Sequence, residues 1–247
     1  MPLFVKPHGR LPTIAIWVFL ISLFLFAPNT SVGAQRSLIG TNGQGKILIM
    51  GDSLTIGTAA FGSLSSKIMN TGLWTSVVLN THEGRKASVG ADLLVKSVSA
   101  DTTAIVVALG TNDMLSRTET WYPKWVIDKV MTSVKNLPVL WVNLEFSDTR
   151  SNWKNRAVRF NRELVKAKTR YANLSIADWN TSFTPKSGSR FIEDGVHLTV
   201  KGYRTRATFM IPAITRFGTD IVNATSTTTT IEPSTTTTEI STITVPL

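Results

Sequence analysis

The sequence contains no cysteine and only three histidines among its 247 residues. The lack of cysteine excludes disulfides, thiolate metal ligands and a cysteine nucleophile. The histidines are His8, His82 and His197, too few for a metal centre that needs several imidazole ligands. We therefore expect no metal site.

Acidic residues are also scarce. The sequence has 16 Asp and Glu but 26 Lys and Arg, which gives a net charge of +10. Much of this excess lies between residues 150 and 170, where Glu163 is the single acid. Such a stretch is either a solvated helix face or a surface suited to nucleic acid, lipid head groups or an acidic cell-envelope polymer. The basic residues are Arg150, Lys154, Arg156, Arg159, Arg162, Lys166, Lys168 and Arg170.

The N-terminal residues 1–34 have the pattern of an export signal. Lys6 and Arg10 precede the unbroken apolar run 14–27, and small residues follow at Val32 and Ala34. The run is shorter than the roughly 20 residues of a membrane span, so we expect a cleaved signal peptide or an uncleaved membrane anchor. Either alternative places the rest of the chain outside the cytoplasm, which argues against a nucleic-acid partner.

The C-terminal residues 223–247 are rich in threonine and poor in large apolar side chains. Too little apolar surface is available there to offset the entropy of ordering, so we predict a disordered tail. Residues 35–45 are expected to be a linker. The folded domain is then residues 46–222, long enough for one sizeable core.

Short apolar runs, rich in β-branched residues, alternate in this domain with segments long enough for helices. In residues 151–171, for example, Trp153, Ala157, Phe160 and Leu164 recur at helical spacing. Buried strands that alternate with helices predict an α/β fold, a three-layer α/β/α sandwich around a five-stranded parallel sheet. The predicted strands are 46–50, 74–80, 103–110, 138–144 and 173–179.

Polar clusters follow four of these strands, at the sheet edge where the sites of such folds collect. The clusters are GDSLT at 51–55, NTHEGRKASVG at 80–90, GTND at 110–113, and EDGVHLTVKGY at 193–203. Together they contain what acyl transfer needs: a serine, a histidine that takes its proton, and a carboxylate that orients the histidine. Ser53, His197 and Asp194 can fill these roles. The oxyanion needs hydrogen-bond donors, which the amides of Ser53 and Gly84 and the side chain of Asn112 can supply.

The four blocks, in this order and spacing, resemble the SGNH or GDSL hydrolase superfamily over residues 46 to about 203. The resemblance implies a flavodoxin-like SGNH hydrolase fold. It also implies that Ser53 is the nucleophile, that Asp194 and His197 form its dyad, and that Gly84 and Asn112 join Ser53 in the oxyanion hole. The sequence looks most like extracytoplasmic SGNH domains of peptidoglycan and polysaccharide O-acetyltransferases. No metal or organic cofactor is expected for this chemistry.

Several neighbouring residues have less specific roles. Gly90 competes with Gly84 for the oxyanion position, and Gly84 is preferred because it directly follows the strand-end loop. Arg85 and Asp113 are candidate substrate contacts, although a solvated side chain and support of the asparagine loop explain them equally well. Asp52 is expected to cap the turn or the next helix, and His82 to lie in a surface loop.

These residues predict an exported serine esterase that acts on O-acyl esters, chiefly O-acetyl esters, of cell-envelope carbohydrate. Three alternatives stay open: an O-acetyltransferase served by a separate membrane acyltransferase partner, a lipase or lysophospholipase-type esterase acting on lipid esters, and a catalytically silent glycan-binding module. The absence of a G-x-S-x-G elbow argues against an α/β-hydrolase. Contact with a membrane is expected only through an uncleaved N-terminal segment.

Overall fold

A computed structural model describes residues 37–39, 45–182 and 190–229. The predicted signal or anchor at 1–34 lies outside these residues. A six-stranded sheet with the order β1-β3-β2-β4-β5-β6 forms the centre of the domain, and only β1 runs antiparallel to its neighbour. The strands are β1 (Ser37–Ile39), β2 (Lys46–Gly51), β3 (Ser76–Thr81), β4 (Thr102–Ala108), β5 (Val139–Val142) and β6 (Leu174–Ala177).

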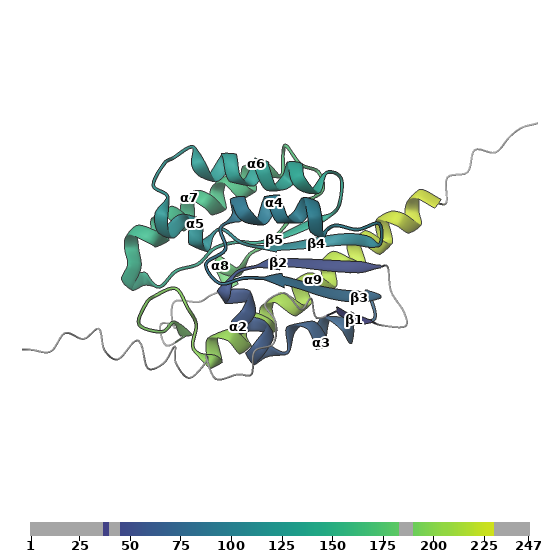
Figure 1. The fold of residues 1–247 in the computed structure, drawn as a ribbon, viewed down its shortest axis with the longest axis horizontal. Coiled ribbons are helices and arrows are strands. Elements are labelled where there is room, and N and C mark those ends of the chain that lie inside the picture. Colours follow the sequence, from purple (N-terminus) through teal and green to yellow (C-terminus); the bar gives the residue numbers. More distant parts are fainter. Residues whose placement is uncertain (1–36, 40–44, 183–189, 230–247) are drawn as a thin grey trace, which may run out of the picture. The chain divides into compact units, whose positions relative to one another are not determined.

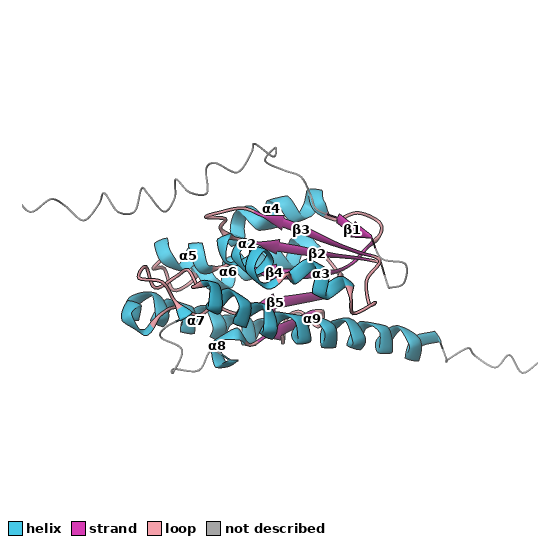
Figure 2. Ribbon diagram, turned by 90° about the horizontal axis from the view of Figure 1, so that it is seen from below, coloured by secondary structure: helices cyan, strands magenta, loops and turns pink. Residues whose placement is uncertain are grey.

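Helices cover both faces of the sheet (Figures 1 and 2). One layer contains α4 (Ala87–Ser97), α5 (Thr111–Ser116), α6 (Tyr122–Val134) and α7 (Ser151–Ala167). The other contains α2 (Ser53–Gly62), α3 (Leu64–Met69), α8 (Trp179–Ser182) and α9 (Val200–Thr229). A 3₁₀ turn, η1 (Asp148–Arg150), precedes α7.

The two faces of β2 show why the sheet needs both layers. Ile47 and Ile49 point into the core beneath α2, α3 and α9, whereas Leu48 and Met50 point into the core beneath α4, α6 and α7. Successive strand residues point to opposite faces, so a strand that is apolar at every position must be covered twice. This confirms the predicted α/β/α sandwich with five parallel strands.

Two boundaries differ from the prediction. Ser37–Ile39, placed in the linker, forms β1 and pairs with β3. This pairing satisfies the outer hydrogen-bonding edge of β3, a tertiary effect that three residues of sequence do not signal. The predicted disordered tail also begins too early, because α9 continues to Thr229. Extending a helix that is already packed costs little per residue, even through threonine. Residues 230–247 lie outside the described part.

The parallel strands end at one edge of the sheet, and the turns that leave them there start α2, α4 and α5 (Figure 1). This edge therefore brings the predicted polar clusters together. Among the described residues, no helix combines the length and apolarity needed to cross a membrane.

Candidate active site

The turn between β2 and α2 places Ser53 at the first residue of a helix, directly after a central strand. Asp52 is the N-cap, and its Oδ1 accepts a hydrogen bond from the amide of Leu54 at 3.0 Å. A Cβ on Gly51 would overlap the side chain of Thr55, so the close approach of helix and strand requires glycine there. The sequence GDS thus builds a tight strand-to-helix turn that presents the Ser53 hydroxyl at the sheet edge.

Ser53, His197 and Asp194 form a continuous hydrogen-bonded chain. The Ser53 Oγ lies 2.9 Å from Nε2 of His197, and Nδ1 of His197 lies 2.7 Å from Oδ2 of Asp194. The other oxygen of Asp194 accepts the backbone amides of Val196 and His197, at 2.8 and 2.9 Å. These bonds fix the carboxylate, which in turn orients the imidazole so that Nε2 faces the serine.

The electrostatics of the pair favour an ionised carboxylate. The hydrogen bond to Asp194 raises the pKa of His197 above its ordinary value, although burial opposes this. Burial raises the pKa of Asp194, but its hydrogen bonds with the His197 side chain and with backbone amides outweigh burial and lower it overall. Asp194 is thus suited to stabilise a proton that His197 accepts.

Arg150 and Ser147 hold the loop that carries Asp194 and His197. Arg150 donates from Nε to the Asp194 carbonyl at 3.0 Å and from Nη2 to the Glu193 carbonyl at 3.1 Å. The amide of Ser147 donates to the carbonyl of Gly195 at 2.9 Å. Gly195 has a φ of +73°, and a Cβ there would collide with the Arg150 side chain. These loop contacts were not predicted, and no local pattern around Arg150 signals them.

Asn112 lies close to the turn that carries Ser53. Its Nδ2 donates to Oδ2 of Asp52 at 3.3 Å and to the carbonyl of Arg85 at 3.2 Å. Asn112 is the second residue of α5, which begins after Gly110 at a φ of +123°. The structure therefore brings the third predicted block against the first and the second.

The structure separates the two glycines of the second block. Gly84 occupies the third position of a turn closed by the Arg85 amide and the His82 carbonyl, with a φ of +67° and open space around it. Gly90 lies within α4, where it packs against Leu109 and its amide donates to the Lys86 carbonyl. Only Gly84 has the exposed position that an oxyanion donor needs.

The remaining predicted residues have structural contacts. The Arg85 guanidinium is buried and donates from Nη1 to the carbonyls of Gly51 and Asn80, an inward orientation that does not support the substrate contact considered for it. Asp113 is fully buried, and it accepts from the Ala87 amide at 2.7 Å and the Tyr122 hydroxyl at 2.6 Å. Asp113 thus supports the asparagine loop.

His82 lies in an exposed loop, where its Nδ1 is 2.6 Å from the carbonyl of Glu83. This is the surface position expected from the sequence. No group of three or more His, Asp or Glu side chains in the described part of the chain is arranged to hold a metal ion.

The buried cation of Arg206, which was not predicted from the sequence, lies behind the turn that carries Ser53. Arg206 of α9 is 3% exposed and donates from Nη1 to the Thr58 hydroxyl at 3.1 Å, while its charge acts on Asp52. Burial raises the pKa of Asp52 to about 6, and Arg206 opposes this rise. Within the described residues, Nε of Arg206 and Oγ1 of Thr55 have no hydrogen-bond partner. The sequence did contain a signal for the burial of Arg206, because this charged residue lies in the apolar stripe of α9, between Tyr203 and Met210.

A second polar network lies at the ends of β5 and β6. Asn143 donates to Asp178 at 2.7 Å and accepts from the Asn180 amide at 2.8 Å. Glu145, whose pKa is raised by burial, contacts Asn180 and forms an ion pair with Lys154 at 3.0 Å. This network ties the β5 loop to the start of α8.

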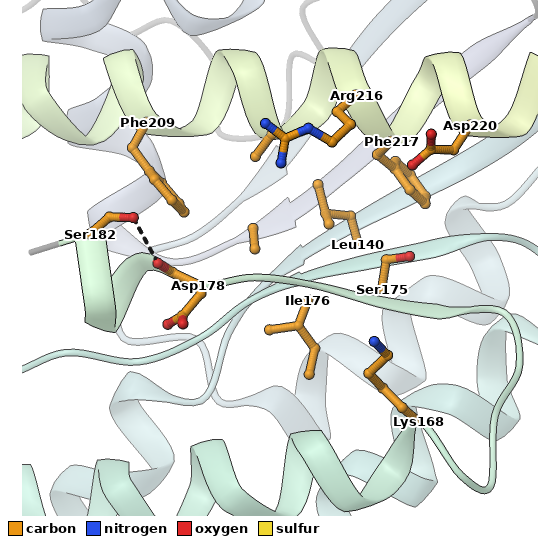
Figure 3. Close-up of a pocket in the computed structure, with 12 residues that line it drawn as sticks. Leu140, Lys168, Ser175, Ile176, Asp178, Ser182, Phe209, Arg216, Phe217 and Asp220 are labelled. Carbon is orange, nitrogen blue, oxygen red and sulfur yellow. Dashed lines mark hydrogen bonds between the residues drawn. The ribbon is translucent and has the colours of Figure 1, made fainter.

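A cavity of about 390 Å³ lies elsewhere, along the edge strand β6 and beneath α9 (Figure 3). Phe209 and Phe217 contribute apolar surface, and Arg216 and Asp220 lie on the α9 side. Its lining includes none of the residues of the Ser53 site. The cavity is therefore separate from the candidate chemistry.

Comparison with solved structures shows the SGNH hydrolase fold. A lipolytic protein of the G-D-S-L family from Veillonella parvula is 20% identical with a TM-score of 0.59, covering 69% of this chain and 98% of its own. A lipase/acylhydrolase from Enterococcus faecalis is 18% identical with a TM-score of 0.58, covering 69% and 95%. The C-terminal catalytic domain of peptidoglycan O-acetyltransferase A from Streptococcus pneumoniae is 14% identical with a TM-score of 0.56, covering 74% and 97%.

Among curated proteins, the one named "Putative peptidoglycan O-acetyltransferase YrhL" from Bacillus subtilis (strain 168) is 23% identical over 163 residues. The match covers 65% of this chain but only 23% of that relative, so the chain spans about a quarter of its length. No protein-family model matches the chain. The fold and this named relative support an ester hydrolase or an acyltransferase.

Proposed function

We propose that this chain is an exported serine esterase that removes O-acyl groups, chiefly O-acetyl groups, from carbohydrate of the cell envelope. The observation that carries the proposal is the chain Ser53–His197–Asp194, with contacts of 2.9 and 2.7 Å, at the strand edge that also holds Asn112. The export pattern of residues 1–34 supports a site of action outside the cytoplasm.

The reaction follows from the geometry. His197 Nε2 accepts the Ser53 proton as Oγ bonds to the ester carbonyl carbon, and Asp194 stabilises the resulting imidazolium. As the tetrahedral intermediate collapses, His197 returns the proton to the sugar oxygen, which leaves as an alcohol. An acyl group stays on Ser53. Water then attacks with His197 again as base, and the acid and the free serine are released.

The oxyanion is held by the amides of Ser53 and Gly84 and by Nδ2 of Asn112. Both Nδ2 hydrogens already have acceptors, at 3.3 Å on Asp52 and 3.2 Å on Arg85. Both contacts are long and therefore weak, so the oxyanion can replace one of them. Asp52 in this way holds Asn112 near its working position before substrate arrives.

Transfer to a sugar hydroxyl is the second candidate. It is favoured by the names of the Bacillus subtilis relative and of the Streptococcus pneumoniae domain, both peptidoglycan O-acetyltransferases. The same acyl-enzyme would form, and a glycan hydroxyl would replace water in the second half of the reaction. An acyl donor supplied by a separate membrane acyltransferase would then be required.

The test is product analysis by mass spectrometry with p-nitrophenyl acetate as donor and a chito-oligosaccharide as acceptor. The full chain should release acetyl groups, and Ser53→Ala should lower kcat by about 10⁶-fold. Free acetate as the sole product that carries the acetyl group supports the esterase, whereas acetylated sugar supports the transferase. Release that does not depend on Ser53, or no release at all, would contradict the proposed enzyme.

A further inference from the structure

Two tryptophans at the start of α6 expose large apolar rings. Trp121 is 59% exposed and Trp125 is 45% exposed. Their ring centroids lie 6.2 Å apart with an interplanar angle of 80°, so the rings meet edge to face. Exposed aromatic surface of this kind marks a site of interaction rather than part of the core.

A buried hydrogen bond connects this pair to the asparagine loop. The ring of Tyr122 lies 5.8 Å from that of Trp121 and 5.3 Å from that of Trp125. Its hydroxyl donates at 2.6 Å to Asp113, the residue that follows Asn112. The start of α6 also follows α5 at the sheet edge where the site lies (Figure 1). The start of α6, which carries the tryptophans, is therefore tied to the loop that carries Asn112.

Basic side chains of α7 contact the segment that leads to the pair. Arg156 of α7 donates to the carbonyls of Met114 and Leu115, and Arg159 donates to that of Thr118, on the segment that leads to Trp121. Within the part of the chain described, neither arginine forms an ion pair with a carboxylate. Lys129 lies 5.7 Å above the Trp125 ring, but its charge is paired with Asp92 at 2.9 Å. Glu119 of the same segment is paired with Arg117 at 3.2 Å, so Arg156 and Arg159 supply the excess positive charge. A ligand that carries negative charge matches this surface.

We propose that Trp121 and Trp125 form a subsite for a sugar ring of an acidic glycan strand, with Arg156 and Arg159 attracting its carboxylates. The less polar face of a sugar ring presents C–H groups, which pack against the negative face of an indole. Two rings at a right angle offer enough surface for a sugar ring. Their area is far below the roughly 800 Å² per partner that a stable protein interface buries, so a protein partner fits this surface less well. This inference rests on the proposed function, for which it specifies the substrate.

Binding is tested apart from catalysis, with the full chain carrying Ser53→Ala. The probe is purified insoluble peptidoglycan, with chitin as the neutral glycan, in a co-sedimentation assay at low salt. Adding Trp121→Ala and Trp125→Ala should weaken binding to peptidoglycan at least tenfold. Val165→Ala, which shortens an exposed apolar side chain of α7, is the matched control and should bind as the parent does. Chitin should bind more weakly than peptidoglycan.

A second measurement uses the unsubstituted protein, so that it does not depend on the folding of a variant. Soluble peptidoglycan fragments should protect Trp121 and Trp125 from oxidation by N-bromosuccinimide, as mapped by mass spectrometry. Unchanged oxidation, equal binding by the double variant, or a dimer that the double variant converts to monomers would overturn the subsite. Neither assay measures ester cleavage, so both results can be interpreted even if the esterase proposal fails.

Discussion

The side chain of Asn112 donates a hydrogen bond to Asp52, the residue directly before Ser53, at 3.3 Å. The other carboxylate oxygen of Asp52 caps α2 through the amide of Leu54 at 3.0 Å. One buried carboxylate therefore sets both the helix that presents the proposed nucleophile and the side chain that we assign to the oxyanion. The two halves of the site share a single support, and each can be tested separately.

Replacing Asn112 by alanine should lower kcat by about 10²–10³-fold, because one preorganised oxyanion donor is lost. The loss should appear equally in kcat and kcat/KM, since the contact is made only in the transition state. Steady-state hydrolysis of p-nitrophenyl acetate measures both. Asn152→Ala, at an exposed asparagine of α7, is the matched control. A change in KM alone would remove Asn112 from the oxyanion hole.

Replacing Asp52 by asparagine should flatten the dependence of stability on pH. Burial raises the pKa of Asp52 from 3.8 to about 6. Its contribution to the free energy of unfolding is therefore fully present below about pH 3.8 and is lost as the pH rises through about 6. The total is roughly 3 kcal/mol. Urea unfolding at acidic and neutral pH should show a smaller decrease for Asp52→Asn than for the parent. Equal decreases would contradict the buried, raised pKa.

Asp194→Asn should change the pH profile as well as the rate. His197 acts as a base only when neutral, so kcat/KM of the parent should fall as the pH drops through a His197 pKa above 6.5. Removing the carboxylate that raises this pKa should move the acid limb to lower pH and reduce kcat by about 10⁴-fold. An acid limb that stays in place would mean that another group titrates.

The two glycines of the second block should respond differently to alanine. Gly84→Ala meets no neighbour, but its φ of +67° disfavours a side chain and should shift the turn. We expect reduced kcat with a small loss of stability, about 1–2 kcal/mol. Gly90→Ala would press on Leu109, and the overpacking should lower the free energy of unfolding by about 1–3 kcal/mol, seen as a lower melting temperature. A loss of kcat in Gly90→Ala with unchanged kcat in Gly84→Ala would instead favour Gly90 as the oxyanion residue.

Arg150→Gln should lower kcat by about 10- to 100-fold without a matching change in KM, because the loop carrying Asp194 loses two carbonyl contacts and moves. Arg150 is a positioning residue and touches no reacting atom. The control is Arg162→Gln, which makes the same change in charge at an exposed position of α7. If both variants lose activity equally, charge rather than loop position is responsible.

The sequence predicted what depends on short-range patterns. The apolar runs of β2 and β4 mark central strands, and the polar residues that follow them meet because parallel strands end at one edge. Ser53 and Asn112 were singled out in this way, whereas His197 was singled out from the block EDGVHLTVKGY, which comes after the last strand. Asp113 was left between two roles, and its full burial with two hydrogen bonds decides for support of the loop.

What the sequence could not predict depends on contacts between distant segments. Arg206 lies opposite Asp52, and Arg150 lies against the loop at Asp194, with no local pattern linking either pair. Arg85 is a further example. A charged residue in a loop is expected to point into solvent, but the Arg85 side chain donates to the carbonyls of Gly51 and Asn80. Burial of a charge is a property of the assembled fold.

Ser53 and His197 are separated by 144 positions along the chain, yet their reactive atoms lie 2.9 Å apart. A ribosome that releases the chain from its N-terminus therefore delivers the serine long before the histidine. During that interval the hydroxyl has no base and is chemically inert. Nearly the whole domain must therefore emerge and fold before the two proposed catalytic side chains can meet.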